Sequence, residues 1–195
     1  MRLSLRKRHL ARAVLPALAL TCLAGAHAAS QPCGTPATPI AEIQGAAAAS
    51  PLAGNVVEVE AIVTADFSGD GGLRGFFLQT ADAQRLHRPG VSEGLFVYAP
   101  RTPARAGDMV RVSGRVEEKF GQTQLALSGA LAVCARGMAV TPQTLTLPVA
   151  GESGLAAREG MLVRLPQTLT VADTHELGRY GTLALSDGRP IAPTQ

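Results

Sequence analysis

The sequence predicts an all-β protein, with a five-stranded barrel at residues 55–138 and an additional, incomplete β segment after it. Two observations support this fold class. Apolar and polar residues alternate with a period of two along several short segments, and glycine-rich turns separate those segments. Five short strands of this kind, with no convincing long helix among them, are typical of a closed or nearly closed barrel.

Five segments account for the predicted barrel. In the first, from Asn55 to Thr64, valine alternates with glutamate, so that one face of the strand is apolar. A glycine-rich turn at residues 68–72 follows. The other four strands are expected at 75–79, 94–98, 109–116 and 123–133.

After the barrel, residues 139–158 have the composition of a proline-bounded linker, and residues 159–195 form a second β segment. Its strands are expected at 159–163, 169–171 and 182–185. Two or three strands with half-exposed apolar faces cannot bury a core of their own. They either pack on the barrel or lack their partners, and we expect the segment to be truncated.

The N-terminus has the three parts of a secretory signal peptide at residues 1–28. A basic head is followed by an apolar run at 13–23 and by the small-x-small site Ala26-His27-Ala28. The run is shorter than the ~20 residues of a membrane-spanning helix. We therefore predict an exported protein, periplasmic or extracellular, that leaves the membrane after cleavage. A retained anchor and a lipoprotein modified at Cys22 are the alternatives.

Residues 29–54 form a Pro/Ala-rich tail in which four prolines prevent a long regular element. A short helix is expected only around Ile40–Gln44.

The basic character of the chain belongs to the export signal. Of the 18 basic residues, five lie in residues 1–28, whereas all 15 acidic residues lie beyond that segment. The mature chain therefore has 13 basic and 15 acidic residues, a net charge of −2. Its overall charge is not evidence for a nucleic-acid-binding surface.

Only Cys33 and Cys134 remain in the mature chain. In an oxidising compartment a single disulfide between them is expected, and two buried free thiols are the alternative. Such a bridge would close a loop of about 100 residues and contribute roughly 4–5 kcal/mol in the loop-entropy model.

Many short phrases in residues 38–195 occur in one order and together resemble a known family. They include Val63-Thr64-Ala65-Asp66-Phe67, Gly72-Leu73-Arg74-Gly75-Phe76-Phe77-Leu78-Gln79, Gly94-Leu95-Phe96-Val97-Tyr98, Gly107-Asp108-Met109-Val110-Arg111-Val112 and Glu159-Gly160-Met161-Leu162-Val163. The region resembles the N-terminal part of large secreted bacterial nucleases of the endonuclease/exonuclease/phosphatase superfamily. In those proteins an OB-fold-like module precedes the catalytic domain.

The resemblance implies an OB-like barrel and a family activity of metal-dependent hydrolysis of extracellular DNA. The divalent metal, Mg²⁺ or Ca²⁺, and the catalytic residues belong to the later domain, so no catalytic residue and no cofactor can be assigned to this chain. The chain resembles a fragment, and we expect no hydrolysis from it alone. A nuclease catalytic domain is the partner that this resemblance implies.

An OB barrel that binds single-stranded DNA or RNA uses exposed aromatic rings for bases and basic side chains for the backbone. Adjacent Phe76 and Phe77 face opposite sides of a strand, so one of them is core. Phe96 and Tyr98 share a face, which a barrel without tryptophan would need inside. The candidate nucleic-acid-binding residues are Arg74, Phe76, Arg85, Arg88, Tyr98, Arg111, Arg115, Lys119 and Phe120.

Metal sites have little support in the sequence. Asp66 and Asp70 begin a calcium-loop-like pattern, but its twelfth position is Phe77 and not an acid, so a hairpin is the better interpretation. Glu58 and Glu60 share a strand face, but the solvent-facing side of a half-buried strand gives the same pattern without a metal. Residues 80–89, where relatives often have an acidic loop, have basic side chains that favour a phosphate contact over a metal.

Two functions therefore remain after the sequence is considered. The first is a non-catalytic, nucleic-acid-handling module of an exported nuclease. The alternative is a structural or protein-interaction β module that does not bind nucleic acid.

Mature protein recovered from the exporting bacterium is expected to begin at Ala29, because cleavage follows Ala28. N-terminal sequencing or intact mass checks this. A Cys22→Ser variant should be cleaved at the same bond, which separates this route from lipoprotein processing. Cytoplasmic protein that still begins at Met1 would contradict the signal peptide.

Overall fold

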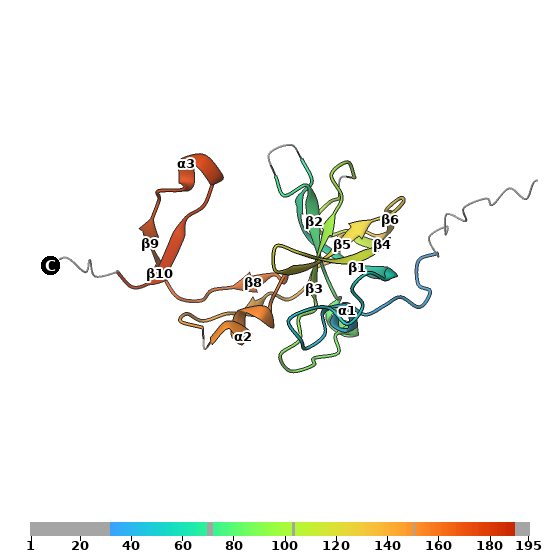
Figure 1. Cartoon of the computed structure of the whole chain (residues 1–195), viewed down its shortest axis with the longest axis horizontal. Helices are drawn as coiled ribbons and strands as arrows, with labels where there is room; N and C mark the ends of the chain where they lie inside the picture. The colour runs from blue at the N-terminus through green and yellow to red at the C-terminus, as the bar shows by residue number, and fades with distance from the viewer. Residues whose placement is uncertain (1–31, 70–71, 103, 150, 190–195) are drawn as a thin grey trace, which may run out of the picture.

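The computed structural model describes residues 32–69, 72–102, 104–149 and 151–189, so the predicted signal peptide lies outside the described residues. Five strands close into a barrel, which confirms the predicted all-β class (Figure 1). They are β1 (Val56–Phe67), β2 (Gly75–Gln79), β3 (Gly94–Tyr98), β4 (Met109–Lys119) and β5 (Gln122–Leu127). Their order is β1-β2-β3-β5-β4, closed by a β1–β4 pairing, and only β3 and β5 are parallel. This is the OB-like order.

The length of β1 closes the barrel. Its first half, residues 56–62, pairs with β4, and its second half, residues 62–67, pairs with β2. The register with β2 shifts between Val63 and Ala65. Such an irregularity bends a strand and increases its twist, which lets one strand belong to both sides of a closed sheet.

The interior of the barrel is aliphatic apart from one ring. Alternate residues of each strand point inward, as the period of two predicts. The strand residues of the hydrophobic core cluster are Val59, Ala61, Val63, Phe76, Leu78, Leu95, Val97, Val110, Val112, Val116 and Leu125.

The segment before β1 packs on the barrel and is not a free tail. The predicted short helix is confirmed as α1 (Ile40–Gln44), and Ile40 and Ile43 join the core cluster. The Gln44 side-chain amide donates to the carbonyl of Gly94 at 2.6 Å, which ties α1 to the start of β3.

Arg111 of β4 holds the segment before β1 against the outer face of the barrel. Its guanidinium is 0% exposed and forms ion pairs with Glu58 at 2.7 Å and Glu60 at 3.1 Å. It also donates to the carbonyls of Thr35 at 2.8 Å and Pro36 at 3.0 Å. The prediction that Arg111 is a surface contact for nucleic acid is therefore wrong, because all of these acceptors surround it.

The predicted disulfide is confirmed between Cys33 and Cys134, whose Cα atoms lie 5.6 Å apart. Cys134 lies on β6 (Ala132–Ala135), which pairs with the start of β4 outside the ring. The single strand predicted at 123–133 is thus two strands, because the chain turns at Gly129 with φ +98°.

After β6 the chain contacts the barrel again before it extends away from it. It contains β7 (Gln143–Thr144), α2 (Gly151–Ala156) and β8 (Val163–Arg164). Earlier in the chain, a 3₁₀ turn, η1 (Asp82–Gln84), lies in the connection between β2 and β3. Most of the strand predicted at 159–163 is instead a docked loop. The Leu162 amide donates to the side chain of Gln79 at 2.8 Å, and the Ser92 hydroxyl donates to the Glu159 carbonyl at 2.6 Å.

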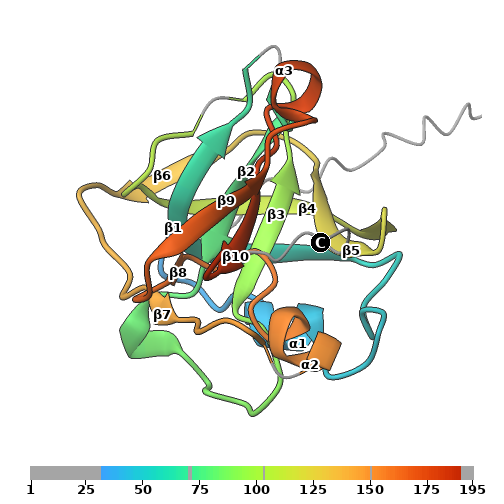
Figure 2. The same ribbon diagram turned by 90° about the vertical axis from the view of Figure 1, so that its left-hand side faces the viewer.

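Two further strands, β9 (Leu169–Asp173) and β10 (Ala184–Asp187), form a hairpin with α3 (Leu177–Tyr180) at its tip. The hairpin stands apart from the barrel at the left of Figure 1, and Figure 2 views it from that side. Val171 and Leu185 are about half exposed. No helix in the described part of the chain is long and apolar enough to cross a membrane.

The Glu159 carboxyl lies against the barrel and accepts a hydrogen bond from the Thr123 amide at 3.0 Å. Burial raises the pKa of this carboxyl above its ordinary value of 4.5, and the nearby Glu118 charge adds to the effect. The hydrogen bond from Thr123 acts in the opposite direction but does not cancel the shift. The charged form of Glu159 therefore weakens the docked loop.

A Glu159→Gln variant is expected to lose this pH dependence. The folded protein binds the Glu159 proton at higher pH than the unfolded chain, so the contribution to stability falls as pH rises from 4.5 through the raised pKa. The free energy of unfolding of the variant minus that of the wild type should therefore increase over this window. Urea unfolding at several pH values measures it.

Glu176→Gln, at an exposed position on the hairpin, controls for the loss of one negative charge. A difference between the Glu159 variant and the wild type that stays constant or shrinks as pH rises would contradict this account.

Candidate aromatic groove

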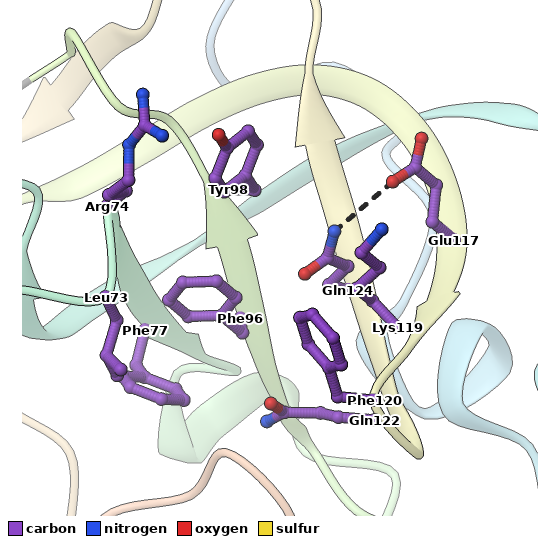
Figure 3. A pocket seen from close by; sticks show the side chains of 10 residues that line it. All are labelled: Leu73, Arg74, Phe77, Phe96, Tyr98, Glu117, Lys119, Phe120, Gln122 and Gln124. Carbon is purple, nitrogen blue, oxygen red and sulfur yellow. Dashed lines mark hydrogen bonds between the residues drawn. The ribbon is translucent and has the colours of Figure 1, made fainter.

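A groove of about 490 Å³ lies on the outer face of the barrel, over β2, β3, β5 and the β4–β5 hairpin (Figure 3). Its floor is aromatic and its rim carries polar and charged side chains. We call it the aromatic groove. The residues that line it are Leu73, Arg74, Phe77, Phe96, Tyr98, Glu117, Lys119, Phe120, Gln122 and Gln124.

Strand register places the aromatic rings on this face. Phe76 is paired with Val97 and is 0% exposed, so its neighbour Phe77 points outward beside its own partner, Phe96. The ring centroids of Phe77 and Phe96 are 5.0 Å apart. The prediction that Phe76 is a binding residue is wrong because Phe76 belongs to the core. The expectation that Phe96 and Tyr98 fill the interior is also wrong, since aliphatic residues and Phe76 fill it.

Gly75 makes room for this arrangement. It lies opposite Tyr98 in the β2–β3 ladder, and a Cβ added at Gly75 would lie 2.6 Å from Cζ of Phe96. The absence of a side chain at this position lets the Phe96 ring lie across β2 and form the groove floor.

Two cations flank the rings. The Arg74 guanidinium lies 5.8 Å from the centre of the Tyr98 ring, and the Lys119 ammonium lies 5.3 Å from the centre of the Phe120 ring. Both distances are in the range of cation–π contacts. Glu117 is engaged by the Gln124 amide at 3.2 Å. The rim thus presents two positive charges and one negative charge.

Phe120 occupies an unfavourable position for a phenylalanine. It forms with Gly121 the two-residue loop between β4 and β5, and their φ values are +54° and +78°. A loop with two positive φ values is the type I′ turn, which prefers Asn-Gly. The Phe120 side chain is also 97% exposed. The positive φ of Phe120 costs stability, and its exposed ring gains almost nothing from burial to offset that cost. Such strained positions concentrate at functional sites.

The other predicted residues lie elsewhere. Arg115 bonds the carbonyl of Gly54, away from the groove. Arg85 and Arg88 line a separate pocket near η1. Among the metal candidates, Asp66 accepts a hydrogen bond from the Ser68 amide at 2.9 Å in a local turn, and Asp70 lies outside the described residues.

The groove therefore joins four of the nine predicted residues, namely Arg74, Tyr98, Lys119 and Phe120. Sequence reasoning considered the floor residues Phe77 and Phe96, but it selected Phe76 over Phe77 and expected Phe96 inside the barrel. The paired Phe76-Phe77 contained the signal, because one of two adjacent strand residues must face outward, but the sequence offered no means of choosing between them.

No protein-family model matches the chain, and no curated protein matches it significantly. The functional argument therefore depends on the geometry and chemistry of the groove.

A Phe120→Asn variant is expected to be more stable than the wild type by about 0.5–1 kcal/mol, because asparagine tolerates positive φ better than phenylalanine does. Urea unfolding measures the change. Phe120→Leu keeps an apolar side chain at the same φ and should gain little by comparison. A less stable asparagine variant would show that Phe120 is not under strain.

Proposed function

We propose that this chain is a non-catalytic module that binds single-stranded DNA or RNA in the aromatic groove, as part of an exported nuclease. One observation carries the proposal. The rings lie on the β2–β3 face of an OB-like barrel, between the β1–β2 and β4–β5 loops, and this face and these loops are where OB folds bind oligonucleotides.

The chemistry of the groove suits unpaired bases. Phe77, Tyr98 and Phe120 offer aromatic surfaces on which bases can stack without regard to sequence, and the buried Phe96 ring supports them from below. Each stacked base contributes roughly 1–3 kcal/mol by alanine substitution. Groups of this kind favour single strands, because the bases of a duplex are already stacked on one another.

Phosphate contacts have a smaller share in this proposal. Arg74 and Lys119 lie beside the rings, where they can contact the backbone between stacked bases. The mature chain has a net charge of −2. We therefore expect stacking to dominate the affinity, with a salt dependence that corresponds to about two phosphate contacts.

The assignment to an exported nuclease depends on the family resemblance and on the export signal. Within it, hydrolysis and the Mg²⁺ or Ca²⁺ ion belong to a catalytic domain that is separate from this module. The acidic pair on the barrel does not suggest a metal centre, because Glu58 and Glu60 are both bonded to Arg111.

The β9–β10 hairpin favours a second candidate function. Val171 and Leu185 are exposed on a two-stranded sheet that cannot bury them by itself, and Leu183 is exposed just before β10. These side chains favour a module that contacts protein, such as the catalytic domain, without a nucleic acid in the groove.

Binding of mature protein to a fluorescein-labelled, short oligothymidylate separates the two candidates. At low ionic strength the wild type should bind measurably. Tyr98→Ala and Phe120→Ala should each weaken binding roughly tenfold, since each removes one stacking surface. Fluorescence anisotropy gives the dissociation constants.

Val133→Ala removes an exposed apolar side chain on β6, outside the groove, and should bind like the wild type. A duplex of the same length should bind more weakly than the single strand. No binding by the wild type at low ionic strength would reject the proposal and favour the protein-contact module.

A further inference from the structure

A second pocket, of about 250 Å³, lies between the loop that follows η1 and the end of α2. Three arginines from two distant parts of the chain meet in its wall: Arg85 and Arg88 from the loop, and Arg158 from the turn after α2. We call it the arginine pocket. Arg85 and Arg88 belong to the basic segment at residues 80–89, for which the sequence favours a phosphate contact over a metal.

A buried carboxylate organises one wall of this pocket. The Glu93 side chain is 3% exposed and forms an ion pair with Nε of Arg85 at 3.3 Å. Its other oxygen accepts a hydrogen bond from the His87 amide at 2.8 Å. Glu93 is therefore occupied within the wall, while the two terminal nitrogens of Arg85 lie outside this ion pair.

Arg158 is held in the pocket without a carboxylate partner among the described residues. One terminal nitrogen donates to the carbonyl of Gly154 at 2.7 Å, and its Nε is buried with no hydrogen-bond partner in the described part of the chain. A buried donor of a charged group without an acceptor is costly. The protein therefore leaves part of the hydrogen-bonding capacity of the Arg158 guanidinium unused in a wall of the pocket.

The loop backbone is also under constraint. His87 has φ +50°, and of the three described non-glycine residues with positive φ it is the one outside the aromatic groove. Arg88, beside it, is half exposed and makes a long contact with Glu42 at 3.4 Å. Such an exposed pair is weak, so Arg88 can turn toward a ligand in the pocket at little cost.

We propose that the arginine pocket binds a phosphate group, as inorganic phosphate or as a phosphate monoester. Planar guanidinium groups pair with phosphate oxygens through two parallel hydrogen bonds, and three of them converge here against one occupied carboxylate. The pocket is separate from the aromatic groove, so the proposal goes beyond the function given above and does not depend on it.

The test uses the mature protein and inorganic phosphate at constant ionic strength, with backbone NMR shifts and isothermal titration as readouts. Phosphate should shift the amide signals of His87, Gly90 and Val91 in a saturable manner, and chloride should not. Arg158→Gln and Arg88→Gln should each weaken binding roughly tenfold, which is the usual effect of losing a charge-assisted hydrogen bond. Arg136→Gln, at an exposed arginine that directly follows β6 and does not line the pocket, should bind like the wild type.

A trinucleotide with a 5′-phosphate and its 5′-hydroxyl counterpart distinguish the two sources of the phosphate. The pocket is assigned to the end of a strand if its amide signals shift with the phosphorylated trinucleotide at lower concentration than with free phosphate and do not shift with the 5′-hydroxyl form. Saturation at the same concentration as free phosphate assigns the pocket to the free ion. Phe120→Asn should retain phosphate binding, so failure of the groove and failure of the pocket are separable. Phosphate shifts that are absent, or equal in the two pocket variants and the wild type, would overturn the proposal.

Discussion

The structure depends on the seam where β1 meets β4, because this pairing converts a sheet into a closed barrel. The Arg111 guanidinium lies on the outside of that seam and bonds Glu58 and Glu60 of β1 together with two carbonyls of the N-terminal segment. Burial lowers the pKa of Arg111, but the two glutamates outweigh this effect and the net pKa is raised. Removing one partner of such a buried group typically costs roughly 3–5 kcal/mol, so the arrangement is interdependent.

The same cluster explains why the segment before β1 is ordered. The Gly34 amide donates to Glu60 at 2.9 Å, and the next residue toward the N-terminus, Cys33, is bonded to Cys134 on β6. The disulfide and the ion pairs therefore hold one stretch of chain from both sides. α1 follows this stretch and adds two isoleucines to the core, so the segment is part of the packed core of the barrel.

Local rules of stability are broken at both candidate binding sites. In the aromatic groove, Arg74 and Phe120 have positive φ, and Phe120 leaves a ring in solvent. In the arginine pocket, His87 has positive φ and Arg158 has a buried, unpartnered donor. Elsewhere in the described barrel, the side-chain amide nitrogen of Gln79 is also buried without a hydrogen-bond partner, and the inward-facing positions otherwise follow the alternation of the strands. Proteins keep such departures mainly where a ligand gains from them, which is the physical reason for giving these two sites the same weight.

The sequence by itself determined the fold class, the strands at 75–79 and 94–98, the short helix at Ile40–Gln44 and the cysteine pair. These features depend on local alternation, on turn residues and on the count of cysteines, all of which are visible along the chain. The first and last residues of the other strands were harder to predict, because hydrogen bonding to a neighbouring strand, and not local composition, determines where those strands end.

Only the tertiary structure decided which side chains face solvent. Phe76 and Phe77 have the same chemistry, and the register of β2 with β3 alone places one in the core and the other in the groove. Arg111 has the sequence context of a surface arginine, yet residues 35–36 cover it from more than 70 positions away. The arginine pocket likewise joins residues near 87 to residue 158. Each of these outcomes depends on contacts between distant segments, which a local pattern does not encode.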